Sequence, residues 1–270
     1  MTAAPRDTTP GHGAVHELGA AVVDLTRGAR DMYGILVRTL YWTFRGRRDP
    51  GAVAKYCFEI GNKSVFFLTV TMGFIGAILV FQSALQALRA VPDLTLLGAT
   101  VLELLVRDLG ASIGALMLAT RVGAGIAAEI GSMVVTEQVD ALRMSGVDPV
   151  DHLIVPRFIA SMIMTGILIV WASAVSFTAG LLTAYFVFDV PVQTFVNFSL
   201  VDWGDLTIGL TKCIAYGAAI PIVSGYCGLS TFGGSEGVGW ATTRAVVNSS
   251  LATIILNFFI SGAGFILFPP

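Results

Sequence analysis

The hydrophobic positions of this chain gather into long runs. Four segments contain no charged residue: Ser64–Leu88, Phe158–Phe188, Cys213–Ser235 and Ala245–Pro270. A helix needs about 20 mostly apolar residues to cross a bilayer, and each of these segments has at least that length. Because lipid offers no hydrogen-bond partners to the backbone, each segment is predicted to be a transmembrane helix.

A fifth apolar segment differs from the others because it carries charge. Leu94–Ala128 contains Glu103, Arg107, Asp108 and Arg121. With 35 residues it is too long for one simple span, and we interpret it as a short outer helix that leads into a transmembrane helix. The pattern therefore predicts an all-α polytopic membrane protein with five transmembrane helices.

The first sixty residues have another character. Residues 1–13 are polar and are predicted to be disordered. Residues 14–60 are predicted to form an interfacial amphipathic helix and its connector to a transmembrane domain at residues 61–270. A soluble helix packed on a partner is the alternative, but the aromatic and basic end of this segment favours the membrane surface. The apolar stripe and that end consist of Val15, Leu18, Val22, Leu25, Ala29, Met32, Leu36 and Leu40, then Tyr41, Trp42, Phe44, Arg45, Arg47 and Arg48.

Positive charge is distributed unequally among the connections. Nine Lys and Arg residues precede the first span, and Arg143 lies in the connection between the second and third spans. The connection Asp189–Asp205 holds three aspartates and no cation. Since cytoplasmic loops are enriched in Lys and Arg, the N-terminus is predicted to be cytoplasmic and the C-terminus to lie on the opposite side.

Composition excludes several classes of protein. Only 13% of the residues are charged and 55% are hydrophobic, whereas a soluble domain carries about 25% charged residues. The net charge of -2 argues against a nucleic-acid-binding protein. Three cysteines without a CxxC pair and three histidines without ligand spacing argue against a disulfide framework, a metal site and a catalytic triad. We expect no catalysis and no cofactor in this chain.

A short capped helix is predicted at about residues 134–146, in the connection between the second and third spans. Glu137 and Asp140 fall early in it and Arg143 falls late, as the helix dipole favours. Gly146 is suited to the left-handed position that follows a helix, and a proline three residues later prevents continuation. The helix is either an ordinary loop helix on the bilayer or the docking site of a cytosolic motor.

The charges of the second span form another candidate site. Glu103 and Arg107 are four positions apart and can pair on one helix face, whereas Asp108 needs a partner elsewhere. Lys212, early in the fourth span, lies at a comparable depth. Charge at membrane depth marks functional cavities, and two cations beside apolar walls are suited to an anionic lipid headgroup. Solvation or pairing at the outer headgroup level is the alternative.

Several motifs resemble those of the MlaE/YrbE permease family, in order from about Gly61 to Phe268. The resemblance implies the permease subunit of an ABC transporter of the Mla or Mce type, which moves phospholipids or other lipids across the cell envelope. It implies a multi-pass protein of the inner membrane with a periplasmic C-terminus. The motifs are LVRDLG (105–110), TRVGAGIAAEIGSM (120–133), TEQVDAL (136–142), VDP (147–149), PR (156–157) and ATTRAVVNSSL (241–251).

The resemblance also implies partners. The family's permeases work as dimers, here with an identical chain or a paralogue, and each half is coupled to a separate ATPase subunit. An MCE-domain protein binds on the outer side. By position, the coupling helix would present Glu137, Asp140 and Arg143 to the ATPase, and we expect Glu129 to take part in this coupling.

The resemblance further implies a lipid-binding site. Arg107 and Asp108 match an Arg-Glu pair near the family's lipid cavity, although the acid is one methylene shorter here, and Lys212 matches a family lysine. We expect these residues and Glu103 to bind lipid, with the headgroup near Arg107 and Lys212 and the tails against the first and fifth spans. Closure of the ATPase subunits would narrow the cavity and pass the lipid to or from the MCE protein.

Two other functions compete with this interpretation. One is a secondary carrier that uses Glu103, Arg107 and Asp108 as a proton or substrate site. Inverted repeats would favour a carrier, but none is evident, and five spans do not divide evenly. The other is a membrane scaffold that tethers a cytosolic partner through residues 129–149.

Overall fold

A computed structural model of the protein describes residues 12–46, 50–90 and 94–267. Within these ranges the chain is helical and contains no β-strand. Five of the helices in these ranges are long. They are α1 (His12–Arg45), α2 (Pro50–Ala90), α7 (Val155–Phe188), α9 (Trp203–Leu229) and α10 (Gly234–Leu267), with shorter helices α3 (Leu97–Leu104), α4 (Gly110–Leu118), α5 (Ala124–Val135), α6 (Gln138–Met144) and α8 (Val192–Phe195).

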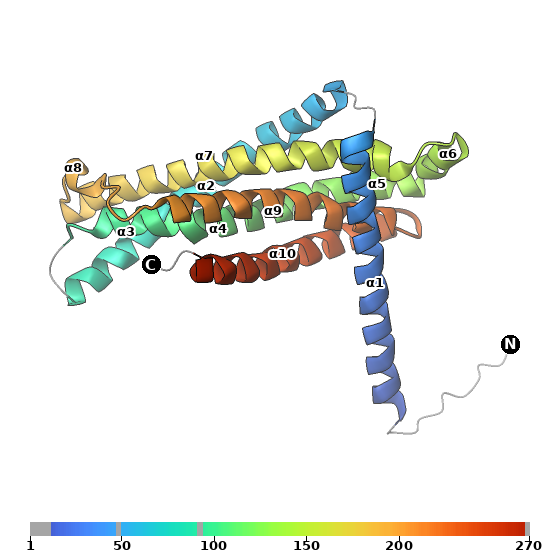
Figure 1. Ribbon diagram of the computed structural model, residues 1–270, viewed down its shortest axis with the longest axis horizontal. Coiled ribbons are helices and arrows are strands. Elements are labelled where there is room, and N and C mark those ends of the chain that lie inside the picture. Colours follow the sequence, from blue (N-terminus) through green and yellow to red (C-terminus); the bar gives the residue numbers. More distant parts are fainter. Residues whose placement is uncertain (1–11, 47–49, 91–93, 268–270) are drawn as a thin grey trace.

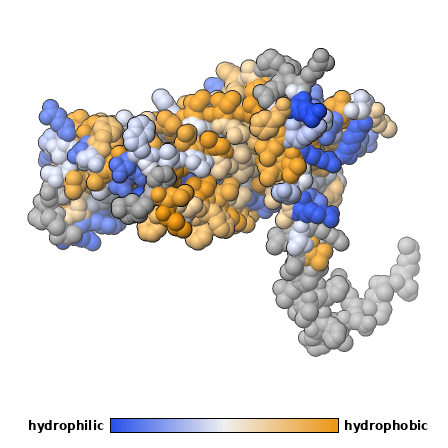
Figure 2. All heavy atoms as spheres, viewed as in Figure 1, coloured by the Kyte–Doolittle hydropathy of each residue, from blue (hydrophilic) through white to orange (hydrophobic). Residues whose placement is uncertain are grey.

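Four helices are long and apolar enough to cross a membrane: residues 51–89, Val150–Phe188, Trp203–Leu229 and Gly234–Leu267. They run lengthwise in one bundle (Figure 1). The visible surface of the bundle is hydrophobic in its middle and hydrophilic towards both ends (Figure 2). Each charge-free stretch of the sequence therefore falls largely within a helix of membrane-spanning length, although Cys213–Ser235 continues past the end of α9 at Leu229 into the turn before α10.

The charged fifth segment is one helical rod, residues 97–135, which comprises α3, α4, α5 and two π-helical turns, Leu105–Leu109 and Ala119–Gly123. The junctions keep right-handed helical dihedral angles. The expected division into an outer helix and a separate span is therefore absent. No proline interrupts the rod, and widened π-helical turns absorb irregularities without ending a helix.

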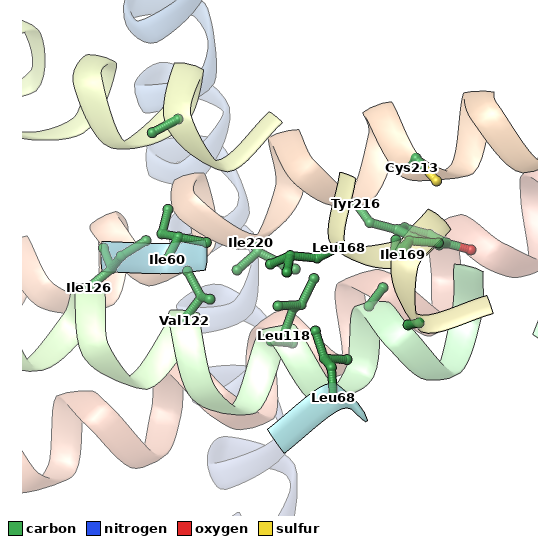
Figure 3. Packing of buried hydrophobic residues seen from close by; sticks show 14 of the residues in the cluster. Ile60, Leu68, Leu118, Val122, Ile126, Leu168, Ile169, Cys213, Tyr216 and Ile220 are labelled. Carbon is green, nitrogen blue, oxygen red and sulfur yellow. The ribbon is translucent and has the colours of Figure 1, made fainter. Parts of the chain in front are cut away.

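The helices meet in a hydrophobic core that runs along the bundle. Leu118 of α4, Leu168 of α7 and Ile220 of α9 point towards one another there, together with Leu68 of α2 (Figure 3). All four side chains are at most 1% exposed. A second, smaller cluster around Phe195 of α8 closes the other end of the bundle. The core holds the rod against α2, α7 and α9 and so determines which charged side chains meet.

Helix α1 crosses the direction of the bundle near the end that carries α5 and α6 (Figure 1). Its aromatic side chains Tyr33, Tyr41 and Phe44 are exposed, while Trp42 Nε1 donates a hydrogen bond to Asp148 Oδ2 at 3.3 Å. A helix across the direction of membrane spans would lie along the membrane surface, and the interfacial position of α1 stays a prediction. The disordered segment expected at residues 1–13 falls almost wholly outside the described residues. Helix α2 continues unbroken through the expected boundary at residue 60.

Candidate functional site

Helix α6 is the short capped helix expected between the second and third spans. It occupies Gln138–Met144, and Glu137, with a left-handed φ of 60°, separates it from α5. Gly146 has a φ of 77°. The amides of Gly146 and Val147 donate to the carbonyls of Arg143 and Leu142, both at 3.1 Å. These bonds make a Schellman motif, so the predicted glycine cap is confirmed.

Helix α6 lies at one end of the bundle (Figure 1). Val139 is buried, whereas Glu137, Asp140 and Arg143 are exposed. Arg143 Nη1 lies 3.0 Å from Asp140 Oδ1, and Met144 is 91% exposed. The helix thus offers opposite charges beside one apolar side chain, a composition suited to a polar protein interface.

Glu129 lies apart from the other residues expected to couple to an ATPase. It belongs to α5, and its Oε1 is 2.7 Å from Nη2 of Arg157 on α7. Arg157 is 1% exposed and Glu129 is 46% exposed. Arg157 belongs to the motif PR (156–157), and its sequence context alone did not predict this pairing. The pair ties α5 to α7 within the bundle.

The charged residues of the rod meet those of α9. Lys212 Nζ is 2.5 Å from Asp108 Oδ1 and donates to the Arg107 carbonyl at 3.1 Å. Ser112 Oγ donates to the same carboxylate at 3.1 Å. Asp108 therefore has the separate partner that its position required. Lys212 is 1% exposed and has little access to water. Its ammonium therefore depends on these two contacts within the chain.

Arg107 pairs with Asp205 rather than with Glu103. Its Nη1 donates to Asp205 Oδ1 at 3.2 Å. The i,i+4 pairing expected with Glu103 presumes a regular α-helix, but a π-helical turn begins at Leu105 between the two residues. Glu103 remains half-exposed.

Asp205 is the site residue that sequence reasoning missed. It is 4% exposed and forms a capping box with Asp202, whose amide donates to Asp205 Oδ2 at 3.1 Å. The spacing Asp-x-x-Asp before an apolar run is a helix-start signal that could have drawn attention to it. This signal does not predict that Asp205 pairs with Arg107.

The charged cluster, defined as Arg107, Asp108, Asp205 and Lys212, is internally neutral. Asp205 and Lys212 are buried, while the side chains of Arg107 and Asp108 are 26% and 41% exposed. Only the latter two can meet a ligand. Among the residues that the structure describes, no group of three or more His, Cys, Asp or Glu is placed to hold a metal ion.

An apolar groove of about 760 Å³ is lined by chain neighbours of the charged cluster, although none of the four cluster residues lines it. Its walls come from the rod, α7 and α9, and include Val106, Phe177 and Leu210. Val106 and Cys213, which also lines the groove, adjoin Arg107 and Lys212 in sequence. The walls were expected from the first and fifth predicted spans, which correspond to α2 and α10, but no residue of either helix lines this groove.

Known proteins match most of the chain. Residues 53–263 match the family described as Permease MlaE. A Synechocystis protein named "Probable ABC transporter permease protein" is 38% identical over 204 residues, 75% of this chain and 77% of the relative. A Rickettsia bellii protein of the same name is 37% identical over 211 residues, 77% of this chain and 81% of the relative.

A plant relative is more distant. "Protein TRIGALACTOSYLDIACYLGLYCEROL 1, chloroplastic" of Arabidopsis thaliana is 32% identical over 212 residues, 76% of this chain and 60% of the relative. The motifs on which the resemblance rested are therefore part of a similarity that extends along all the long helices from α2 to α10. The chain belongs to the MlaE permease family, in which it is a multi-pass membrane permease and not itself an enzyme.

Proposed function

We propose that this chain is the permease subunit of an ABC transporter that moves phospholipids or related lipids between membranes of the cell envelope. The observation that carries the proposal is that Arg107 and Asp108 are partly exposed while Val106, their neighbour in the chain, lines the apolar groove. A phospholipid combines an anionic phosphate with long apolar tails, and a guanidinium beside apolar walls complements both. The name of the Arabidopsis relative includes the name of a glycolipid, trigalactosyldiacylglycerol, and this supports a lipid cargo.

The residues of the charged cluster take different parts in this function. Arg107 contacts the lipid headgroup. Asp108 orients this headgroup or repels headgroups of unsuitable charge. Lys212 and Asp205, both buried, hold these two side chains in place. Glu103, half-exposed one turn away, lies at the rim of the site. The lipid tails follow the apolar groove.

Different surfaces of the bundle are assigned to the three proposed partners. The rod serves as the second of five spans, and the end of the bundle with α6 faces the cytoplasm, with the chain in the inner membrane. There α6 docks a separate ATPase subunit, and an MCE-domain protein binds at the opposite end. In the most apolar 18-residue stretch of α2 only 28% of the residues are buried, and in that of α10 only 11%. These faces are suited to a second permease protomer, identical or a paralogue.

Loss of the Arg107 guanidinium is expected to reduce lipid binding. A charge-assisted hydrogen bond to a phosphate contributes about 1.5–3 kcal/mol, so R107A should retain about tenfold less lipid. The measurement is mass spectrometry of the lipids that copurify with the tagged chain in mild detergent. The matched control is R89A, which removes an exposed arginine at the end of α2. Equal lipid retention by R107A and R89A would refute the site.

Exchange of the charges on α6 is expected to weaken ATPase docking. The double variant Glu137→Lys/Arg143→Glu places each new charge opposite a charge of the same sign on the ATPase. Like-charge contacts at an interface can cost several kcal/mol of binding free energy. We expect about tenfold weaker capture of the ATPase subunit in a pull-down, with the membrane level of the chain unchanged. The control exchanges the exposed pair Arg30 and Asp31 on α1. If a well-folded preparation of the unmodified chain captured no ATPase, the secondary carrier would become the better interpretation.

A further inference from the structure

A polar cavity lies far from the charged cluster. This polar pocket, of about 580 Å³, is enclosed by α2, the rod near α5, and α7. Ala128 and Glu129 in its wall belong to α5, which lies at the end of the bundle near α6 (Figure 1). Arg121, in its wall, is 14 positions after Arg107, which is about 21 Å along a helix. The pocket is therefore distinct from the lipid site proposed above.

Arg157 forms the floor of the polar pocket. It is 1% exposed, yet carries a charge that three neighbours accommodate. Its Nη2 pairs with Glu129, its Nη1 donates to the Leu153 carbonyl, and its guanidinium stacks on the Tyr56 ring, 4.3 Å from the centroid. The stack and the ion pair fix the plane of the guanidinium, so its Nε–H donor has a defined direction.

Two buried donors in the wall of the pocket have no partner. Within the part of the chain that the structure describes, neither Nε of Arg157 nor Oγ of Ser64 makes a hydrogen bond. Both residues line the pocket and are 1% exposed. Leaving such a group unsatisfied costs about 1–3 kcal/mol, more when it is charged. A ligand with acceptor oxygens would satisfy both donors.

The charges of the pocket specify the ligand further. Its ionisable walls hold the cations Lys63, Arg121 and Arg157 and the carboxylates Glu59 and Glu129, which gives a formal charge of +1. Lys63 and Arg121 are exposed and can move towards a ligand. Guanidinium and ammonium groups around an acceptor-rich anion are typical of phosphate sites.

The position of the pocket in the bundle indicates where the phosphate comes from. Ser64 is the first residue of the charge-free stretch of α2, so the pocket lies where the apolar part of the bundle begins. Ile60, Val122 and Ile126 supply an apolar wall beside the charged one. A lipid headgroup meets this boundary, with its glycerol and tails continuing along the apolar surface of α2, of which Phe66, Phe67 and Phe74 are exposed.

We propose that the polar pocket binds the phosphate of an anionic phospholipid from the leaflet next to α6. The phosphate accepts hydrogen bonds from Arg157 Nε and Ser64 Oγ, and Lys63 and Arg121 neutralise its charge. Binding joins α2 to α5 and α7 at the end of the bundle where α6 lies. This site requires neither an ATPase nor transport, and it goes beyond the proposed function.

The test uses the purified full-length chain in phosphatidylcholine nanodiscs. A small fraction of photoreactive phosphatidylglycerol or photoreactive phosphatidylcholine is added, and the labelled peptides are mapped by mass spectrometry. We expect phosphatidylglycerol to label peptides of α2 and α5 that line the pocket, and to label them more than phosphatidylcholine does. Lys63→Gln/Arg121→Gln should lower this labelling about tenfold.

Two further variants separate a specific site from general attraction. Lys55→Gln/Arg89→Gln removes two cations of α2 that do not line the pocket, and its labelling should equal that of the unmodified chain. Ser64→Ala deletes one small donor without disturbing the Arg157–Glu129 pair. It should lower labelling about threefold, as the loss of one neutral hydrogen bond predicts.

Three results would overturn the proposal. Equal labelling by the two lipids would exclude the preference for an anionic headgroup. Displacement of the lipid by millimolar inorganic phosphate would show that a soluble anion is the ligand. An equal loss in the control variant would reduce the effect to surface charge. R107A is expected to keep the labelling of this pocket, so failure here is distinguishable from failure of the transport site.

Discussion

Replacing Asp108 with asparagine is expected to destabilise the protein by about 3 kcal/mol, the lower end of the cost of breaking a buried ion pair. The cost arises at Lys212, which is 1% exposed and would keep only the Arg107 carbonyl and a neutral amide as partners. Lys212→Met should cost less, about 1 kcal/mol, because Asp108 is 41% exposed and can be hydrated. The order of the two variants therefore follows from which partner is buried.

The double variant Asp108→Asn/Lys212→Met provides the control for this prediction. It removes both charges, so no unpaired charge stays buried, and it should be more stable than Asp108→Asn alone. The measurement is thermal unfolding of the purified chain in detergent, together with its level in the membrane. A double variant as unstable as the two single losses combined would contradict the pairing of Asp108 with Lys212.

Adding one methyl group at Gly76 is expected to destabilise the contact of α2 with α7 by about 3 kcal/mol or more, the upper range for overpacking. A Cβ atom there would lie 2.0 Å from the carbonyl oxygen and 2.6 Å from the carbonyl carbon of Ser176. Because both atoms belong to the backbone of α7, relief requires that the helices move apart. Small residues allow this close approach of helices in membranes.

Gly73, one turn earlier on α2, is the matched control. A Cβ atom at this position would lie 3.8 Å from Val175 Cγ1, an ordinary van der Waals distance. Gly73→Ala should therefore be neutral or slightly stabilising, since alanine is the better helix former. Comparison of the midpoints of thermal unfolding and the yields of the two variants tests the prediction. Equal losses in Gly73→Ala and Gly76→Ala would show that the clash is not the cause.

Much of the architecture could be predicted from local patterns. The long charge-free stretches became the helices α2, α7, α9 and α10. The glycine cap of α6 at Gly146 was predicted as well, since a left-handed residue after a helix is a local feature. The break at Glu137 was not predicted, because glutamate has no intrinsic preference for a positive φ.

The candidate site could be predicted only in part. Arg107, Asp108 and Lys212 were selected because charge is costly at membrane depth. Their partners were not foreseen in full: Asp205 lies 98 positions from Arg107, and a π-helical turn separates Arg107 from Glu103. A regular helical wheel contains neither of these facts.

The sequence by itself determined that this chain is a bundle of membrane-spanning helices, because the requirement of the bilayer for about 20 apolar residues acts on each segment separately. It also identified the family through motifs that stand in order along the chain. Only the tertiary structure decided which charges meet: Arg107 with Asp205, and Glu129 with Arg157. The reason is physical, since these pairs depend on the rotation and depth of packed helices, which close packing at glycines and core side chains determines.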